Sequence, residues 1–246
     1  MAETQSQKSP LARAPENSFF KMTEKNRNAH RSRIQEIDQI PMAAESPHIP
    51  SFMQQMGESI TKTAGTLDPT QMTCFFDEML SAKRIYVAGA GRSGLIAKAF
   101  GLRMMHLGYE SYVVGETITP SFQPGDTLVV FSGSGETQSM VSTCETARDL
   151  RGRVCVITAM PDSRIGKLAD CIVNLGDPTD TYVHDKNSFE VRQLTGKYRS
   201  VTSAFAPFGT MFETLALVFS DALISSIMEV RKDEIARMQG RLSNVE

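Results

Sequence analysis

Residues 85–94, IYVAGAGRSG, and residues 128–137, LVVFSGSGET, share the pattern that decides the fold. In each stretch, an apolar run typical of a buried strand leads into a turn rich in glycine and serine, and a helical pattern follows. A glycine-rich turn that opens a helix presents backbone N–H groups at the positive end of the helix dipole, where a phosphate binds well. Two such turns in one chain predict one phosphate held by backbone N–H groups and by serine and threonine hydroxyls.

Short apolar runs alternate with helical patterns through the middle of the chain, which predicts an α/β fold with a parallel sheet covered on both faces. The last helix is expected from about 208 to 232, and two helices are expected before the sheet, the second starting at Asp68-Pro69 with aspartate as the N-cap. The expected strands lie near 84–88, 111–115, 127–131, 153–158 and 171–175, and the helices between them near 92–107 and 136–150.

We divide the chain into an arm over residues 1–48, one domain over 49–232 and a charged tail over 233–246. The arm is polar and shows no sustained apolar period, so we expect it to be disordered. Its mild basic excess keeps an organelle-targeting segment as an alternative, although it also contains acidic residues, which transit peptides tend to lack. Residues 177–205 form a long polar segment, which is typical of a functional lid or of disorder.

The composition favours a small metabolite as the ligand. The formal net charge is −2 and both signs are mixed along the chain, so we expect no nucleic-acid partner. The chain has no uninterrupted apolar run of membrane length and no apolar signal core near its start, so we expect no membrane partner and a cytoplasmic protein. Its cysteines are widely spaced in apolar surroundings, which predicts reduced structural thiols and no metal site; they are Cys74, Cys144, Cys155 and Cys171.

Residues 89–94 also match G-x-G-x-x-G, the dinucleotide-binding pattern, and Glu116 closes the next expected strand, where an acid that binds a ribose would lie. An NAD-dependent oxidoreductase is therefore an alternative. The second turn favours a single phosphate instead, because Ser132, Ser134 and Thr137 add three hydroxyls to its backbone N–H groups. A pyrophosphate that passes over a bare glycine turn needs fewer donors. Ordinary tight turns rarely combine so many hydroxyls and glycines.

Longer phrases carry a resemblance to a known family. They are VAGAGRSG at 87–94, RMMHLG at 103–108, VVGETITP at 113–120, SGSGET at 132–137, PDSRIGKLAD at 161–170 and PFGTMFE at 207–213. Together they resemble the 6-phospho-3-hexuloisomerase branch of the sugar isomerase (SIS) domain family. The resemblance implies a three-layer sandwich with a five-stranded parallel sheet between helices, a phosphosugar ligand, and a homotetramer with sites at subunit interfaces.

The implied reaction interconverts a 3-hexulose 6-phosphate and fructose 6-phosphate by moving a carbonyl between C3 and C2. It needs a base, an enediol intermediate and a proton donor, and it requires no metal or other cofactor. Glu213 is our first candidate for the base, because a carboxylate just inside the last helix can reach the carboxyl edge of the sheet. Its alternative role is an acid favoured by the helix dipole. His106 is the second catalytic candidate, and a structural role at its helix end is the alternative.

The remaining candidates are assigned to substrate binding. Ser93, Ser132, Ser134 and Thr137 are the expected phosphate ligands, by the hydroxyl argument and by the family motif. We expect Gly91 and Gly135 to shape the two turns. Arg92 is expected either to pair with the phosphate or to be a solvated or ion-paired surface residue. Glu116 and Thr117 are expected either to contact sugar hydroxyls or to cap the turn that contains them.

The end of the chain departs from the family. Members commonly end in RHANLE, whose histidine is a candidate for proton transfer, whereas residues 241–246 are RLSNVE. Leu242 stands at the position of that histidine and cannot exchange a proton. Either His106 or His184 supplies the function, or the histidine is dispensable, or the protein binds phosphosugars without converting them, as a sensor or regulatory protein.

Overall fold

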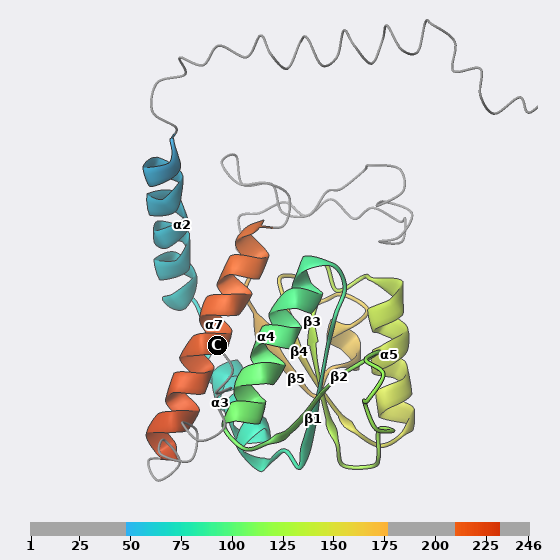
Figure 1. Ribbon diagram of the computed structural model, residues 1–246. Coiled ribbons are helices and arrows are strands. Elements are labelled where there is room, and N and C mark those ends of the chain that lie inside the picture. The colour runs from blue at the N-terminus through green and yellow to red at the C-terminus, as the bar shows by residue number, and fades with distance from the viewer. Residues whose placement is uncertain (1–47, 177–209, 232–246) are drawn as a thin grey trace, which may run out of the picture. The chain divides into compact units, whose positions relative to one another are not determined.

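The structure is a computed structural model that describes residues 48–176 and 210–231 (Figure 1). The expected arm, apart from its last residue, lies outside the described residues. The polar segment with His184 and the tail with Leu242 lie outside them too.

The described chain alternates strands and helices as the sequence predicts. In chain order the elements are α2 (Ile49–Ala64), α3 (Pro69–Ser81), β1 (Arg84–Gly89), α4 (Arg92–His106), β2 (Glu110–Val113), β3 (Thr127–Phe131), α5 (Gln138–Asp149), β4 (Arg153–Thr158), the 3-10 turn η2 (Gly166–Leu168), β5 (Cys171–Asn174) and α7 (Thr210–Val230). Asp68 caps α3 as expected, since its carboxylate accepts from Thr70 N at 2.7 Å. Such a cap contributes about 1 kcal/mol to helix stability.

The five strands form one parallel sheet in the order β2-β1-β3-β4-β5. Neighbours β1 and β3 are separated in the chain by α4 and β2, so the connections leave these two strands in opposite directions across the sheet. The carboxyl edge between two such strands is the topological switch point at which open α/β folds bind ligands.

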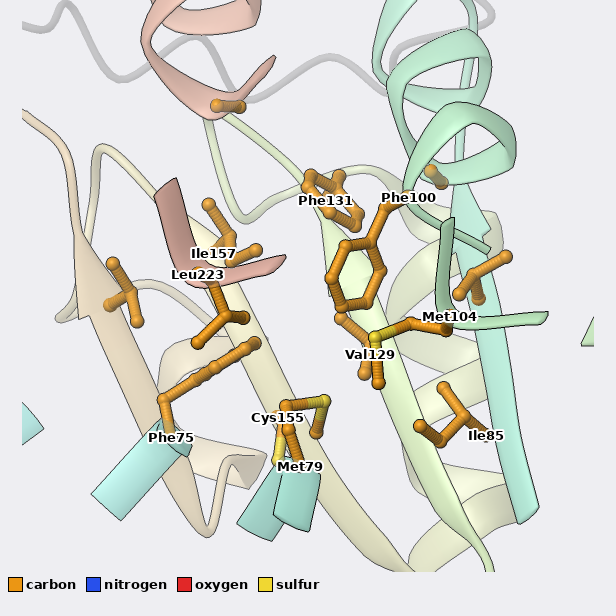
Figure 2. Packing of buried hydrophobic residues seen from close by; sticks show 14 of the residues in the cluster. Phe75, Met79, Ile85, Phe100, Met104, Val129, Phe131, Cys155, Ile157 and Leu223 are labelled. Carbon is orange, nitrogen blue, oxygen red and sulfur yellow. The ribbon is translucent and has the colours of Figure 1, made fainter. Parts of the chain in front are cut away.

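Helices cover both faces of the sheet, which confirms the predicted three-layer sandwich (Figure 1). On one face, Phe100 and Met104 of α4 pack with Leu223 of α7 over Val129 and Ile157 of the sheet (Figure 2). On the other face, α5 packs against the alternate side chains of β1, β3 and β4. Each large side chain that is fully buried contributes roughly 1.5 to 3 kcal/mol, so these two cores hold the strand ends in place.

The last helix belongs to the core of the domain. Residues Met211–Val230 are long and apolar enough to cross a membrane, but 44% of that window is buried inside the protein. Ala216 and Ile227 are fully buried, and α7 contacts α4 and α2. Packing against these helices accounts for the apolar residues on the buried side of α7.

The prediction of four reduced thiols is wrong for two of them. Cys74 of α3 and Cys171 of β5 form a disulfide with a Cα–Cα separation of 5.9 Å, because α3 packs directly against β5. A sequence separation of 97 residues gives no sign of this pairing. Cys144 and Cys155 are free and buried, as predicted. Burial raises the pKa of the Cys144 thiol to about 12, which makes it inert as a nucleophile.

Candidate active site

The two glycine-rich turns start side by side at the carboxyl edge of the sheet. We call residues 89–94 the first loop and residues 132–137 the second loop. Gly89 and Phe131 are partners in the register of β1 and β3, so the two strands end together. The first loop leads into α4 and the second into α5, and these helices lie on opposite faces of the sheet (Figure 1). The loops therefore flank the crevice at the switch point.

Both loops present the start of a helix without a side-chain cap. The N-cap residues are Gly91 for α4 and Thr137 for α5; neither makes a capping hydrogen bond, and neither helix has an acidic residue in its first turn. Gly91 has a φ of 58°, a conformation that glycine adopts without strain. The first backbone N–H groups of a helix have no partner within the helix, so both helix starts suit an anion.

A neighbouring turn fixes the shape of the second loop. Gly135 has a φ of 60°, and a Cβ at this position would lie 1.8 Å from Ser163 Oγ. The Gly135 carbonyl accepts from Ile165 N at 3.1 Å, and Glu136 Oε1 accepts from Arg164 N at 3.0 Å. Residues 163–165 therefore hold the second loop in place, and the Glu136 side chain makes one of the hydrogen bonds between them.

The hydroxyls of the second loop have few partners in the protein. Ser132 and Thr137 are buried, and within residues 48–176 and 210–231 neither hydroxyl makes a hydrogen bond, in keeping with an expected role toward a ligand. Ser134 Oγ accepts from Glu136 N at 3.3 Å. Accepting leaves the hydrogen of this hydroxyl available, so all three hydroxyls can donate to an oxyanion.

Glu213 lies in the first turn of α7 and contacts the first loop. Ser93 Oγ donates to Glu213 Oε1 at 3.2 Å, and Arg92 Nε lies 3.6 Å from Glu213 Oε2. Oε2 is buried and accepts no hydrogen bond from the described residues. Burial raises the pKa of Glu213, while the Arg92 charge and the Ser93 hydroxyl act in the opposite direction. A partly desolvated carboxylate with one unbonded oxygen is suited to accept a proton.

The residue before Glu213 contacts the second loop. A Cβ on Gly133 would lie 3.0 Å from Phe212 Cδ1, so the start of α7 packs closely on this loop. Phe212 and Glu213 together place the first turn of α7 against both loops. The carboxylate therefore lies at the edge of the sheet predicted for it.

Comparisons with known proteins show which family has this sheet and these two loops. The SIS domain matches residues 78–187, which include the sheet and both loops. The 3-hexulose-6-phosphate isomerase of Bacillus subtilis is 39% identical over 171 residues, which are 69% of this chain and 84% of the relative. The chain belongs to the SIS domain family. This confirms the family that the sequence phrases predict.

Further relatives of this SIS protein agree with the predicted branch. The 3-hexulose-6-phosphate isomerase of Mycobacterium gastri is 32% identical over 189 residues, which are 77% of this chain and 87% of the relative. A solved protein of Methanococcus jannaschii, for which a molecular function of 3-hexulose-6-phosphate isomerase was inferred, superposes with a TM-score of 0.61. It is 29% identical, and the match covers 79% of this chain and 98% of that one.

Two residues that we expected to bind the substrate lie on the segment that follows β2, beside the two loops. Glu116 Oε1 pairs with Lys98 Nζ of α4 at 2.5 Å, and both side chains are about half exposed. Thr117 is exposed too. The two curated relatives reported above are named 3-hexulose-6-phosphate isomerase, an activity that needs no dinucleotide. That alternative therefore loses its support.

His106 does not lie near the first or the second loop of its own chain. His106 is the last residue of α4, whereas Ser93 lies in the first turn, and a rise of about 1.5 Å per residue separates them by about 20 Å along the helix. The ring is buried, and Nδ1 has no hydrogen-bond partner among the described residues.

Sequence reasoning missed two features of the site. It assigned Ser93 to the phosphate alone, although the hydroxyl also bonds Glu213 across 120 residues of chain. It also gave no role to residues 163–165, which clamp the second loop. The phrase PDSRIGKLAD was a signal for this clamp, since it follows β4 at the same edge of the sheet.

Proposed function

We propose that the protein is a 6-phospho-3-hexuloisomerase, which interconverts a 3-hexulose 6-phosphate and fructose 6-phosphate through an enediol. The observation that carries this proposal is the Glu213 carboxylate, held in the first turn of α7 where the two glycine-rich loops meet. Relatives named 3-hexulose-6-phosphate isomerase at 39% and 32% identity support it.

The loops hold the phosphate in this proposal. The N–H groups at the starts of α4 and α5 donate to its oxygens, and Ser132, Ser134 and Thr137 add hydroxyl donors. Arg92 supplies a positive charge from the first turn of α4, where its side chain is 56% exposed and able to reach a ligand. Hydrogen bonds to a charged group are roughly twice as strong as neutral ones, so several of them anchor the substrate by its phosphate and leave the sugar carbons free to react.

Glu213 is the proposed base. It removes the proton from C3 of fructose 6-phosphate, which gives an enediol across C2 and C3, and it returns the proton to C2 while the carbonyl forms at C3. One carboxylate can serve both carbons because they are directly bonded to each other. The oxygens of the enediol also exchange one proton. His106 lies at the far end of α4 and does not reach this transfer within its own chain, and His184 lies outside the described residues.

Isotope exchange tests the reaction directly. Fructose 6-phosphate incubated with the protein in D₂O should gain deuterium at C3 and give the 3-keto isomer in the same time course, because the enediol exchanges its proton with solvent through the base. NMR follows both signals. Saturable binding of fructose 6-phosphate without exchange or conversion would support the sensor alternative, which the leucine at position 242 motivates.

We further propose that the protein is a cytoplasmic homotetramer. Three apolar side chains of α4 are well exposed in the single chain, Leu95 at 65%, Leu102 at 52% and Met105 at 39%, and a subunit interface would cover them. Sedimentation equilibrium measures the assembly. Leu102→Glu should dissociate it, whereas Leu150→Glu, on α5's side of the sheet, should leave it intact.

The disulfide between Cys74 and Cys171 is the feature that bears on the proposed location, because disulfides are rare in reducing compartments. Mass spectrometry of protein alkylated inside intact cells reports the state of Cys74. A Cys74 that is alkylated in the cytoplasm, with the enzyme found there by fractionation, would support the proposed location.

A further inference from the structure

The hydroxyl hydrogen of Ser93 has one acceptor in the protein and would have a second in a bound phosphate. Its hydroxyl lies in the first turn of α4, among the groups proposed to bind the phosphate, yet it donates to Glu213 Oε1 at 3.2 Å. A serine hydroxyl has a single hydrogen to donate. A phosphate dianion at the start of α4 therefore competes with the carboxylate for it.

Arg92 is placed to respond in the same way. Its Nε lies 3.6 Å from Glu213 Oε2, which is an ion-pair distance but too long for a good hydrogen bond. Its side chain is more than half exposed, while that of Glu213 is only 12% exposed. A dianion bound in front of α4 would attract the guanidinium more strongly than the carboxylate does.

We propose that Ser93 is a positioning residue whose one hydroxyl hydrogen holds Glu213 in the geometry observed here and turns to the phosphate when substrate binds, which frees the carboxylate to take a proton from the sugar. This rests on the proposed function in one respect only, that an oxyanion binds at the first loop. Binding of the phosphate would then prepare the base, and a sugar without a phosphate would not.

The charges around Glu213 make the effect measurable. The Arg92 charge and, to a smaller extent, the Ser93 hydroxyl lower the pKa of Glu213 against the larger effect of burial, so withdrawing both groups raises this pKa further. Arg92 of α4 is the charged group paired with Glu213 among the described residues; α2, α3 and the second loop contribute no ion pair to it there. Binding of a dianion should therefore be accompanied by uptake of protons by Glu213, over the pH range between its pKa values in the free and bound protein.

Sulfate is the probe for this coupling, because it is a tetrahedral dianion that does not titrate in the range of interest. Calorimetric titrations of the full chain in buffers of different ionisation enthalpy, at pH 5 to 7, give the number of protons taken up per sulfate. The wild type should take up a fraction of a proton, and Glu213→Gln should take up none. Ser93→Ala should show a smaller uptake than the wild type, and Ser93→Thr, which keeps the hydroxyl, should restore the wild-type value.

The outcomes separate this inference from the proposed function. Sulfate binding without proton uptake in the wild type would overturn the role of Ser93 and leave the phosphate site intact. Equal uptake by Ser93→Ala and the wild type would also overturn it, because charge repulsion and the withdrawal of Arg92 would then account for the coupling without Ser93. If sulfate does not bind at all, the phosphate site itself is wrong. Circular dichroism of each variant checks that the fold is retained.

Discussion

The two glycine-rich loops have similar sequences and different partners. In the second loop, the hydroxyls of Ser132 and Thr137 make no hydrogen bond to the described residues, and the backbone is held by residues 163–165. In the first loop, Ser93 bonds the carboxylate of Glu213. The same strand, turn and helix pattern thus yields one loop suited to binding and one that connects binding to the proposed base. The position of α7 gives the first loop its partner, since the first turn of α7 brings Glu213 to Ser93.

The largest effect should come from Glu213→Gln, which removes the base and keeps the shape of the side chain. General base catalysis contributes about 10²- to 10⁴-fold, so kcat for fructose 6-phosphate should fall by that factor while its Kd, from calorimetry, stays nearly the same. Glu145→Gln, on the exposed surface of α5, is the matched control. An unchanged kcat in Glu213→Gln would show that Glu213 is not the base, and the first loop would then have no link to catalysis that the second loop lacks.

Gly135→Ala should damage the second loop. The added Cβ would collide with Ser163 Oγ, and φ at this position is 60°, so the loop has to change shape. We expect fructose 6-phosphate to bind roughly 100-fold more weakly, equivalent to about 3 kcal/mol.

Gly125→Ala is the control for that strain, since φ there is 86° and the space around it is open. It should lower stability and leave binding unchanged. If both variants bind fructose 6-phosphate like the wild type, the clamped shape of the second loop is not needed for the ligand.

Ser134→Ala should have a smaller effect, because it removes one donor among several. A hydrogen bond to a charged group contributes about 1.5 to 3 kcal/mol, so Kd for fructose 6-phosphate should rise by roughly 10- to 150-fold at most, with kcat preserved. Ser139→Ala, on the exposed surface of α5, provides the comparison. A fall in kcat with no change in Kd would mean that the second loop acts in catalysis and not in binding.

The smallest effect concerns stability. Burial raises the pKa of Glu213 above its ordinary value of 4.5, so the folded protein binds the proton more tightly than the unfolded chain. The charged carboxylate therefore destabilises the fold increasingly as the pH rises from 4.5 through the folded pKa. Glu213→Gln should melt at a higher temperature than the wild type at pH 7, and the two curves should meet near pH 4. A variant that melts lower than the wild type at pH 7 would show that the carboxylate stabilises the fold.

Local pattern was enough to predict the fold and the edge that carries the site. Apolar strands, glycine turns and the cap at Asp68 are encoded by neighbouring residues, and the sequence locates all five strands. Contacts between segments that are distant in the sequence were harder to predict. The Ser93–Glu213 hydrogen bond and the disulfide join residues 120 and 97 positions apart, and no short pattern encodes them. The length of α4 already excluded His106 from the first loop of its own chain, since the two lie at opposite ends of one helix.

The disulfide divides the chain into a covalent ring and a linear remainder. The ring runs from Cys74 to Cys171 and contains both loops, whereas Glu213 lies outside it. Cleavage of the backbone between 177 and 209 would therefore separate the candidate base from the loops as distinct fragments on a denaturing gel. A single cut between 114 and 126 would release no fragment until the disulfide is reduced, so the oxidised protein keeps the two glycine-rich loops linked even after its backbone is broken between them.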